Sequence, residues 1–237
     1  MPLPKVNTPT YDLTLPSGKR IKYRPFLVRE EKILIMALET EDQKQITDAV
    51  IQILSSCIVT RGIKIEKLAT FDIEYLFLNV RSKSVGETIK VNIICPDDEK
   101  TSVEIPIDLD SIKIKKDKSH TDIVKLDDTL SMKLKYPSMK QFIESNFEAG
   151  KETISNTMEV ITSCIDIIYN DEESWSASES TQKELEEFID QLDTKQFQTI
   201  EKFFDTMPKL SHRVKVKNPK TEVESTVILE GLAAFFN

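Results

Sequence analysis

Alternation of apolar and polar residues marks the first predicted element, a hairpin close to the start of the chain. Its arms are Tyr11–Leu15 and Lys19–Tyr23, and Ser17-Gly18 between them supplies a residue that tolerates turn dihedrals. Pro25 follows shortly after the second arm. Proline cannot donate a ladder hydrogen bond, and it biases the preceding Arg24 towards extended dihedrals. We therefore expect the hairpin to end at Pro25 and a new element to begin beyond it.

Helical periodicity replaces the alternation after this proline. A first helix is predicted over Val28–Glu39, because the early carboxylates of Glu30 and Glu31 suit the positive end of a helix dipole. A second helix is predicted from apolar residues that recur at spacings of three and four. These residues are Ile46, Ala49, Val50, Ile53, Leu54, Cys57 and Ile58. A third helix is predicted around Ile73–Val80, with Thr70 as its cap.

A pair of strands completes the first half of the chain. Thr88–Ile94 and Thr101–Ile107 are predicted strands, and Cys95–Lys100 between them contains the proline and aspartates of a turn. The charged tract Lys113–Lys118 carries no periodic apolar face, which is typical of a linker. We therefore place a domain boundary there. The expected organisation is an N-terminal α+β half over 1–116 and a C-terminal α+β half over 117–237.

The second half is predicted to contain elements of the same kinds. Thr129–Tyr136 alternates like a strand. An acidic, Ser-rich insert near 170–181 is predicted to be a mobile loop, and a helix around Leu185 follows it. Predicted strands at Arg213–Lys217 and Glu222–Leu229 close this half.

Short segments recur in the same order in the two halves, which predicts an internal duplication. The matching pairs are Lys22–Pro25 with Lys135–Pro137, Ile53–Ile58 with Val160–Ile165, Phe71–Val80 with Phe197–Thr206, Ile89–Val91 with Val214–Val216, and Cys95-Pro96 with Asn218-Pro219. Under a duplication, Cys57 and Cys164 occupy equivalent buried positions on helices; chance agreement between short segments is the alternative. The expected fold class is α+β, with two related halves. Each half has a hairpin or strand, amphipathic helices and a closing antiparallel strand pair.

Composition excludes several functional classes. With 40 acidic and 32 basic residues, the formal charge is −8 and the pI is near 5.0, so we expect no nucleic-acid partner. No apolar run approaches the roughly 18 residues of a membrane span. The first ten residues lack the apolar core of a signal peptide, so the chain is expected to stay in the cytoplasm where it is made.

Residues suited to catalysis or metal binding are few. The chain has three cysteines, Cys57, Cys95 and Cys164, and an odd number favours buried reduced thiols. A zinc ribbon would place a second ligand three residues after Cys95, where the chain has Asp98. Neither His120 nor His212 lies near a nucleophile motif, and the five glycines form no phosphate-binding loop. We therefore predict no catalytic residue, no cofactor and no metal; the alternative enzyme class is a hydrolase whose carboxylates only the fold brings together.

The stretch Ser17–Ile35, SGKRIKYRPFLVREEKILI, joins a hairpin, a K-x-R-P-F turn and an E-E-K helix start. This arrangement resembles the start of the T-even (T4-like) phage baseplate protein family, which includes hub subunits and hub-assembly proteins. The resemblance implies a non-enzymatic protein that forms or assembles the central hub of a contractile tail's baseplate. Its expected partners are other hub or tail proteins, in the host cytoplasm during assembly and in the virion tail. A tail-assembly chaperone absent from the mature virion is the alternative.

Surface contacts with such partners would need exposed charged or apolar residues, and the chain offers a candidate near each end. The hairpin carries a basic cluster next to an aromatic residue: Lys19, Arg20, Lys22, Arg24 and Phe26. The C-terminal tail carries Leu232, Phe235 and Phe236. Ordinary solvation of the hairpin and docking of the tail on the protein's own core are the alternatives. The sequence does not indicate an oligomeric state.

Overall fold

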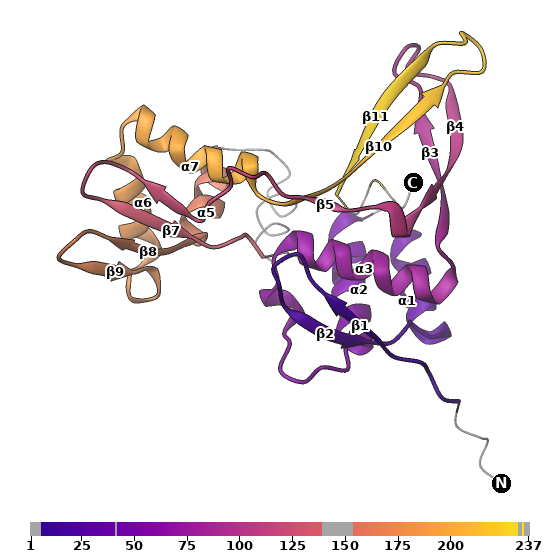
Figure 1. The fold of residues 1–237 in the computed structure, drawn as a ribbon, viewed down its shortest axis with the longest axis horizontal. Coiled ribbons are helices and arrows are strands. Elements are labelled where there is room, and N and C mark those ends of the chain that lie inside the picture. The colour runs from indigo at the N-terminus through magenta and orange to yellow at the C-terminus, as the bar shows by residue number, and fades with distance from the viewer. Residues whose placement is uncertain (1–5, 41, 139–153, 232–233, 235–237) are drawn as a thin grey trace. The chain divides into compact units, whose positions relative to one another are not determined.

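The computed structural model describes residues 6–40, 42–138, 154–231 and 234. Its fold is α+β, as the sequence predicts, with helices beside small antiparallel sheets (Figure 1). The chain forms two compact units, each taken here over its described residues. The first unit comprises Met1–Ile65, Phe71–Lys115 and Lys209–Asn237, and the second comprises Glu66–Thr70 and Lys116–Pro208.

The predicted N-terminal hairpin consists of β1 (Tyr11–Thr14) and β2 (Arg20–Tyr23). Gly18 adopts a φ of 89° in the turn, a left-handed conformation that favours glycine. Side chains alternate along a strand, so Ile21 is buried under the hairpin while Lys22 is exposed.

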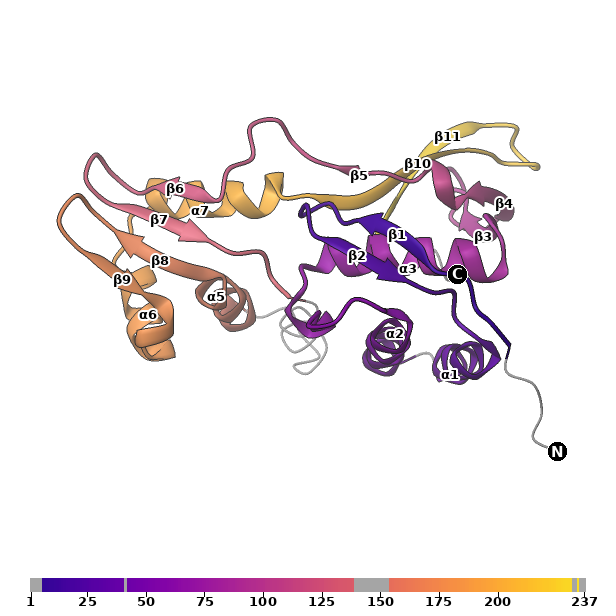
Figure 2. The ribbon, with the colours of Figure 1, turned by 60° about the horizontal axis from the view of Figure 1, so that its bottom comes forward.

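Three helices form the body of the first unit: α1 (Val28–Leu38), α2 (Gln43–Cys57) and α3 (Thr70–Val85). Figure 2 shows α1 and α2 beside each other. On α3, Ile73, Leu76, Phe77 and Val80 are fully buried, and buried residues surround the helix. A helix buried all round lies at the centre of a core, so α3 is the central helix of the first unit. Short 3₁₀ helices, η1 (Ile65–Lys67) and η2 (Leu109–Ser111), lie in the connections.

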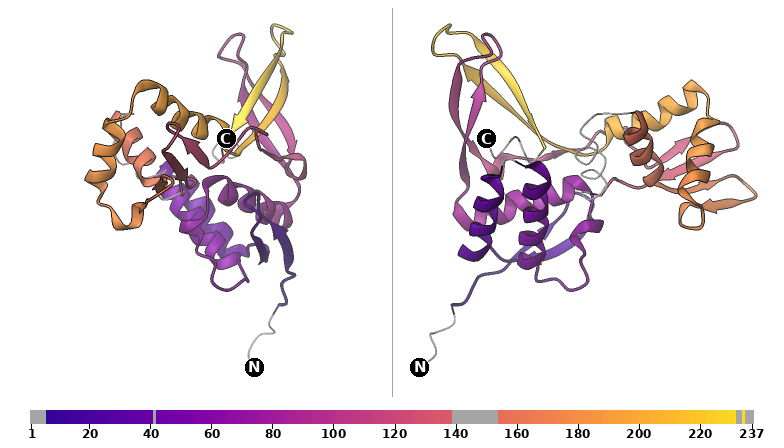
Figure 3. Two further views of the ribbon diagram at one scale, coloured as in Figure 1. Left: turned by 60° about the vertical axis from the view of Figure 1, so that its left-hand side comes forward. Right: turned by 180° about the vertical axis from the view of Figure 1, so that it is seen from behind.

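Two further hairpins belong to the first unit: β3 (Thr88–Ile94) with β4 (Ser102–Asp108), and β10 (Lys209–Lys217) with β11 (Glu224–Glu230). The first strand of the second hairpin, β10, also pairs with the short strand β5 (Ile114–Lys115). This pairing explains why the C-terminal strands belong to the first unit. The two hairpins lie side by side in Figures 1 and 3, and Asn218 Nδ2 donates to both carboxylate oxygens of Asp97, at 3.1 and 3.0 Å.

The second unit contains a four-stranded antiparallel sheet in the order β6-β7-β8-β9. Its strands are β6 (Ile123–Lys125), β7 (Ser131–Leu134), β8 (Ile165–Tyr169) and β9 (Ser174–Ser176). Its helices are α5 (Ile154–Ser163), η3 (Ala177–Glu179), α6 (Gln182–Asp190) and α7 (Thr194–Thr206). Met132 and Ile165 from the sheet pack with Ile200 and Phe203 from α7 in one hydrophobic cluster. This cluster is the core of the second unit.

The prediction of a mobile loop near 170–181 is wrong. Ser174–Ser176 pairs with β8, and Asn170 Oδ1 accepts the N–H groups of Glu172 and Glu173 at 2.9 and 2.6 Å. Strand β8 follows α5 almost directly and is a short apolar run, which periodicity alone does not distinguish from a buried helix segment. Because the sequence does not distinguish β8, it indicates no strand partner for β9, and the polar segment has the composition of a loop.

Cys57 and Cys164 have similar surroundings. Cys57 ends α2, Cys164 directly follows α5, and both are buried. The Cys57 carbonyl accepts the N–H of Arg24 at 2.9 Å, and the Cys164 carbonyl accepts the N–H of Lys135 at 2.7 Å. Each acceptor therefore joins a helix end to the exit of a hairpin. These parallels agree with a duplication, and superposition of the two halves stays a prediction.

Candidate partner-binding surface

The β1–β2 hairpin presents basic side chains to solvent. Lys19, Arg20 and Lys22 are exposed, because they lie on the outward face of β2 or just before it. The turn of the hairpin is fixed to the central helix, where Ser17 N–H donates to Asp72 Oδ1 of α3 at 3.0 Å. The basic group therefore sits on a rigid support.

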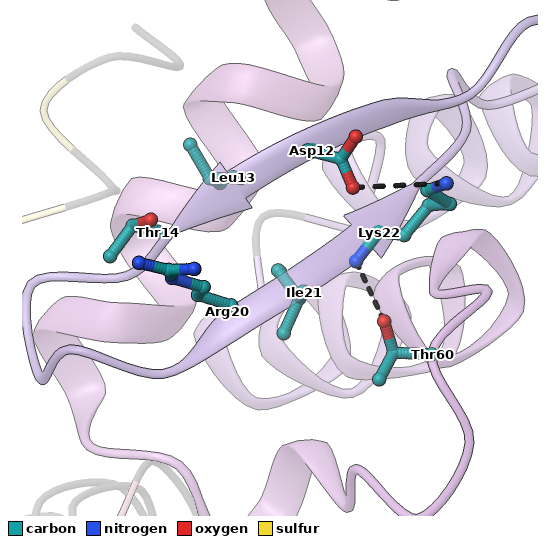
Figure 4. A pocket seen from close by; sticks show the side chains of 7 residues that line it. All are labelled: Asp12, Leu13, Thr14, Arg20, Ile21, Lys22 and Thr60. Atoms are coloured by element: carbon teal, nitrogen blue, oxygen red, sulfur yellow. Dashed lines mark hydrogen bonds and ion pairs between the residues drawn. The ribbon is translucent and has the colours of Figure 1, made fainter.

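A shallow depression of about 410 Å³ runs along this hairpin (Figure 4). It is lined by Asp12, Leu13, Thr14, Arg20, Ile21, Lys22 and Thr60. Lys22 Nζ lies 3.8 Å from Asp12 Oδ1, in an ion pair whose side chains are both largely exposed. Such a pair contributes little to stability, since solvent screens it. Both charges are therefore available to a partner at little cost to the fold.

One edge of the hairpin is already occupied. The Lys22 carbonyl accepts the N–H of Val59 at 2.8 Å, and Lys22 N–H donates to Thr60 Oγ1 at 2.7 Å. Residues after α2 therefore cover the outer edge of β2. Thr60 has no local signal in the sequence, because it is 38 residues distant from Lys22 along the chain. The backbone edge left for a partner strand is that of β1.

Arg24 and Phe26, also predicted as contact residues, occupy interior positions. The Arg24 side chain is 14% exposed, and its Nη2 donates to Glu30 Oε1 at 2.9 Å and to the Ser56 carbonyl at 3.0 Å. Phe26 is 8% exposed, and its N–H donates to Ser84 Oγ at 2.9 Å. Both residues tie the exit of the hairpin to the helices.

Glu30 is the buried carboxylate at this junction. Burial opposes its ionisation, but hydrogen bonds from Arg24, the Leu27 N–H and Arg29 outweigh burial and lower its pKa to about 2. Its Oε2 accepts the Leu27 N–H at 2.8 Å and so caps the start of α1. The charge of Glu30 is therefore used to join the hairpin to α1.

Burial also shifts the pKa values of other titratable groups. Burial raises the pKa values of Cys57 and Cys164 to about 11, so both thiols stay protonated at neutral pH. Burial also raises the pKa of Asp72, whose Oδ2 has no hydrogen-bond partner among the described residues. In the second unit, burial lowers the pKa of His120, whose ring nitrogens lie 2.9 Å from Thr206 Oγ1 and Tyr136 OH.

Metal-binding clusters and membrane-spanning helices are absent from the residues that the structure describes. Within residues 6–40, 42–138, 154–231 and 234, no group of three His, Cys, Asp or Glu side chains could hold a metal ion. None of the helices in this part of the chain is long and apolar enough to cross a bilayer. Leu232, Phe235 and Phe236, the candidates in the C-terminal tail, lie outside the described residues.

Comparison with known proteins identifies the family. Searches of curated proteins and of solved structures returned no significant match. A family model described as T4 bacteriophage base plate protein matches residues 8–237. The match includes both units and the K-x-R-P-F turn on which the sequence resemblance rests. The chain therefore belongs to the T4 bacteriophage base plate protein family.

Proposed function

We propose that this protein is a non-enzymatic structural or assembly component of the baseplate hub in a contractile phage tail. The observation that carries this proposal is the family match over 8–237. Within the family, the hub assignment rests on the resemblance of Ser17–Ile35 to hub subunits and hub-assembly proteins. The protein would act through stable contacts with other hub or tail proteins.

The exposed basic group on β2 is the first proposed contact surface. Lys19, Arg20 and Lys22 form a local positive surface on a chain of charge −8, and their support on α3 needs no rearrangement. A preorganised charged surface favours fast and selective association with an acidic partner. Asp12 and Thr14 add hydrogen-bonding groups beside it. The C-terminal Leu232, Phe235 and Phe236 form the second proposed surface, because aromatic side chains are effective interface anchors.

An enzymatic role has less support. A hydrolase would need carboxylates held near each other with pKa values suited to proton transfer. The lowered pKa values of Glu30 and Asp98 arise from hydrogen bonds that build a helix start and a turn. Asp98 accepts the N–H groups of Lys100 and Thr101 at 3.1 and 2.9 Å. These carboxylates therefore serve local backbone structure.

Charge reversal on the hairpin tests the proposed contact. Changing Lys19, Arg20 and Lys22 to Glu should reduce co-purification of hub proteins from infected cells by about tenfold or more, since exposed ion pairs contribute ~0.5–1 kcal/mol each. Circular dichroism should be unchanged, and the melting temperature should fall only slightly, because Lys22→Glu places a like charge opposite the exposed Asp12. The matched control reverses Lys118, Lys125 and Lys195, which are exposed residues of the second unit. Equal losses from both variants would mean that the hairpin is not the contact.

The C-terminal surface is tested by changing Phe235 and Phe236 to Ala. Burial of both rings at an interface contributes on the order of a few kcal/mol, so partner capture should fall while the fold is retained. A lowered melting temperature would instead place both rings in the protein's own core.

Retention in the particle separates a hub subunit from an assembly chaperone. Quantitative mass spectrometry of purified mature tails should find a hub subunit in fixed ratio to the other baseplate proteins. A chaperone would co-purify with assembly intermediates and be absent from mature tails. Co-purification with no tail protein at any stage would contradict the proposed function.

A further inference from the structure

The outer face of the β5–β10–β11 sheet carries a stripe of basic residues that the baseplate assignment does not explain. On β10, Lys209, Arg213, Lys215 and Lys217 are exposed, while Val214 and Val216 on the opposite face are buried. Side chains on alternate positions share one face of a strand. The four cations therefore project from the same face, of which Ser211 is the one buried position on β10.

The arrangement of these cations is unfavourable for the isolated protein. Lys209 lies directly opposite Lys115 of β5, and like charges at opposite positions of antiparallel strands destabilise a sheet. Across β10–β11, Arg213 is opposite Ile228, Lys215 is opposite Thr226 and only Lys217 is opposite a carboxylate, that of Glu224. Glu230 is opposite Ser211. None of the five cations forms an ion pair with a residue that the structure describes.

The neighbouring hairpin provides an internal comparison. On the exposed face of β3–β4, Lys90 lies opposite Pro106. Its Nζ lies 2.6 Å from Oε1 of the neighbouring Glu104. The one lysine of that face is therefore paired within the hairpin. The β10 face therefore keeps an excess of positive charge, because its five cations share it with only two carboxylates, those of Glu224 and Glu230. This excess indicates that a negatively charged external partner contacts the face.

We infer that the outer face of β10–β11, extended by Lys115 of β5, docks an acidic segment of another tail protein. Cations at alternate positions of β10 are spaced by roughly 6.5–7 Å, which matches carboxylates at alternate positions of a partner strand. Ile228 is 49% exposed in the middle of the stripe and offers an apolar contact, which suits a protein surface. A nucleic acid fits less well, because its regularly repeated phosphates would meet Glu224 and Glu230 on β11, whereas the carboxylates of a protein segment can be spaced to avoid them.

This inference rests on the proposed function for the source of the partner, and on the geometry for the surface. Zero-length carbodiimide cross-linking of baseplate complexes tests the surface directly, because this reagent joins a lysine amine only to a carboxylate in contact with it. Mass spectrometry should find Lys215 or Lys217 joined to Asp or Glu of another tail protein. Changing Arg213, Lys215 and Lys217 to Gln should reduce capture of that protein about tenfold or more at low salt.

The control is Lys90→Gln, which removes a cation from the paired hairpin and should leave capture unchanged. High salt should weaken capture by the wild type much more than capture by the triple variant, since salt screens exposed charges. Unchanged circular dichroism would show that the triple variant folds.

Each other outcome rejects the inference in a distinct way. If the wild type captures tail proteins without a cross-link from β10, and the triple variant captures them equally well, the proposed function stands and this surface is rejected. Cross-links only to a second copy of the chain would identify self-association instead. Retention of a DNA duplex by the wild type, lost in the triple variant, would identify a nucleic-acid surface. If the wild type captures no tail protein, the proposed function itself fails.

Discussion

At the scale of single residues, neighbouring basic side chains in one run have different roles. Lys22 lies on β2 and Arg24 directly follows it at an alternate position. The sequence predicts both as contact residues. Lys22 stays exposed, whereas the Arg24 guanidinium bonds Glu30, the Pro25 carbonyl and the Ser56 carbonyl. Residue type alone does not separate these roles, because the acceptors that bury Arg24 come from two other elements.

Glu30 provides the residue-scale prediction. Its pKa is lowered from an ordinary 4.5 to about 2, so its ionised form stabilises the fold fully above pH 4.5. This contribution, on the order of 3 kcal/mol, is lost as the pH falls from 4.5 through 2. Glu30→Gln should therefore lower the free energy of unfolding by about that amount at pH 7, and the difference from wild type should shrink in acid. Urea denaturation at several pH values measures it.

The control for this prediction is Asp12→Asn, which removes a carboxylate whose side chain is 84% exposed. Its effect should be within about 0.5 kcal/mol. A Glu30→Gln protein as stable as wild type at pH 7 would show that the Arg24–Glu30 pair does not hold the junction.

At the scale of elements, the two closing hairpins are joined at their tips. Asn218 is 1% exposed, its Nδ2 donates to Asp97, and its Oδ1 accepts the N–H of Lys220 at 2.8 Å. Thr221 Oγ1 donates to the same carboxylate of Asp97. One side chain therefore both shapes the β10–β11 turn and connects it to the β3–β4 turn.

Asn218→Ala should destabilise this pair of hairpins. Loss of bonds that leaves buried polar groups unsatisfied costs about 1–3 kcal/mol. Hydrogen exchange should become faster at both turns, including the amide of Lys220, while α5, α6 and α7 in the second unit keep their protection. Asn92→Ala, on the exposed face of β3, is the matched control. Faster exchange confined to the β10–β11 turn would show that the tips are not coupled.

At the scale of the whole molecule, the compact units do not coincide with the sequence halves. The break after residue 115 lies next to the predicted boundary at 116, but Lys209–Asn237 joins the first unit. The turns after β3 and β10 also share a feature: Glu99 and Glu222 have positive φ values of 52° and 63°. Their N–H groups bond the carbonyls of Cys95 and Asn218, both at 2.9 Å. A duplication in which the second closing hairpin, β10–β11, packs beside its counterpart β3–β4 would explain both the boundaries of the units and the matching turns.

An experimental structure should test this duplication. We expect β2, α2, α3 and the β3–β4 hairpin to superpose one by one on β7, α5, α7 and the β10–β11 hairpin. Cys57 should then fall on Cys164. Cysteines at unrelated positions after superposition of the helices would reduce the sequence matches to chance.

The sequence by itself determined most of the local elements, although not β8 and β9. Alternation located the β1–β2 hairpin and the closing strand pairs, helical spacing located α2 and α3, and the residues 17–35 indicated the family. These features follow from local burial patterns, because a strand or helix that packs on one side repeats its apolar residues with its own period. The exposed positions of Arg20 and Lys22 followed from the same alternation, whereas Lys19 is exposed because it lies just before β2.

Only the tertiary structure decided which elements meet. It paired β10 with β5, joined Asn218 to Asp97 across 121 residues, placed β9 beside β8, and buried Arg24 against Glu30. The basic face of β10 also became recognisable only there, since β11 and β5 determine which charges remain unpaired. The physical reason is that periodicity records whether a residue is buried, while the identity of its neighbour depends on contacts between distant parts of the chain.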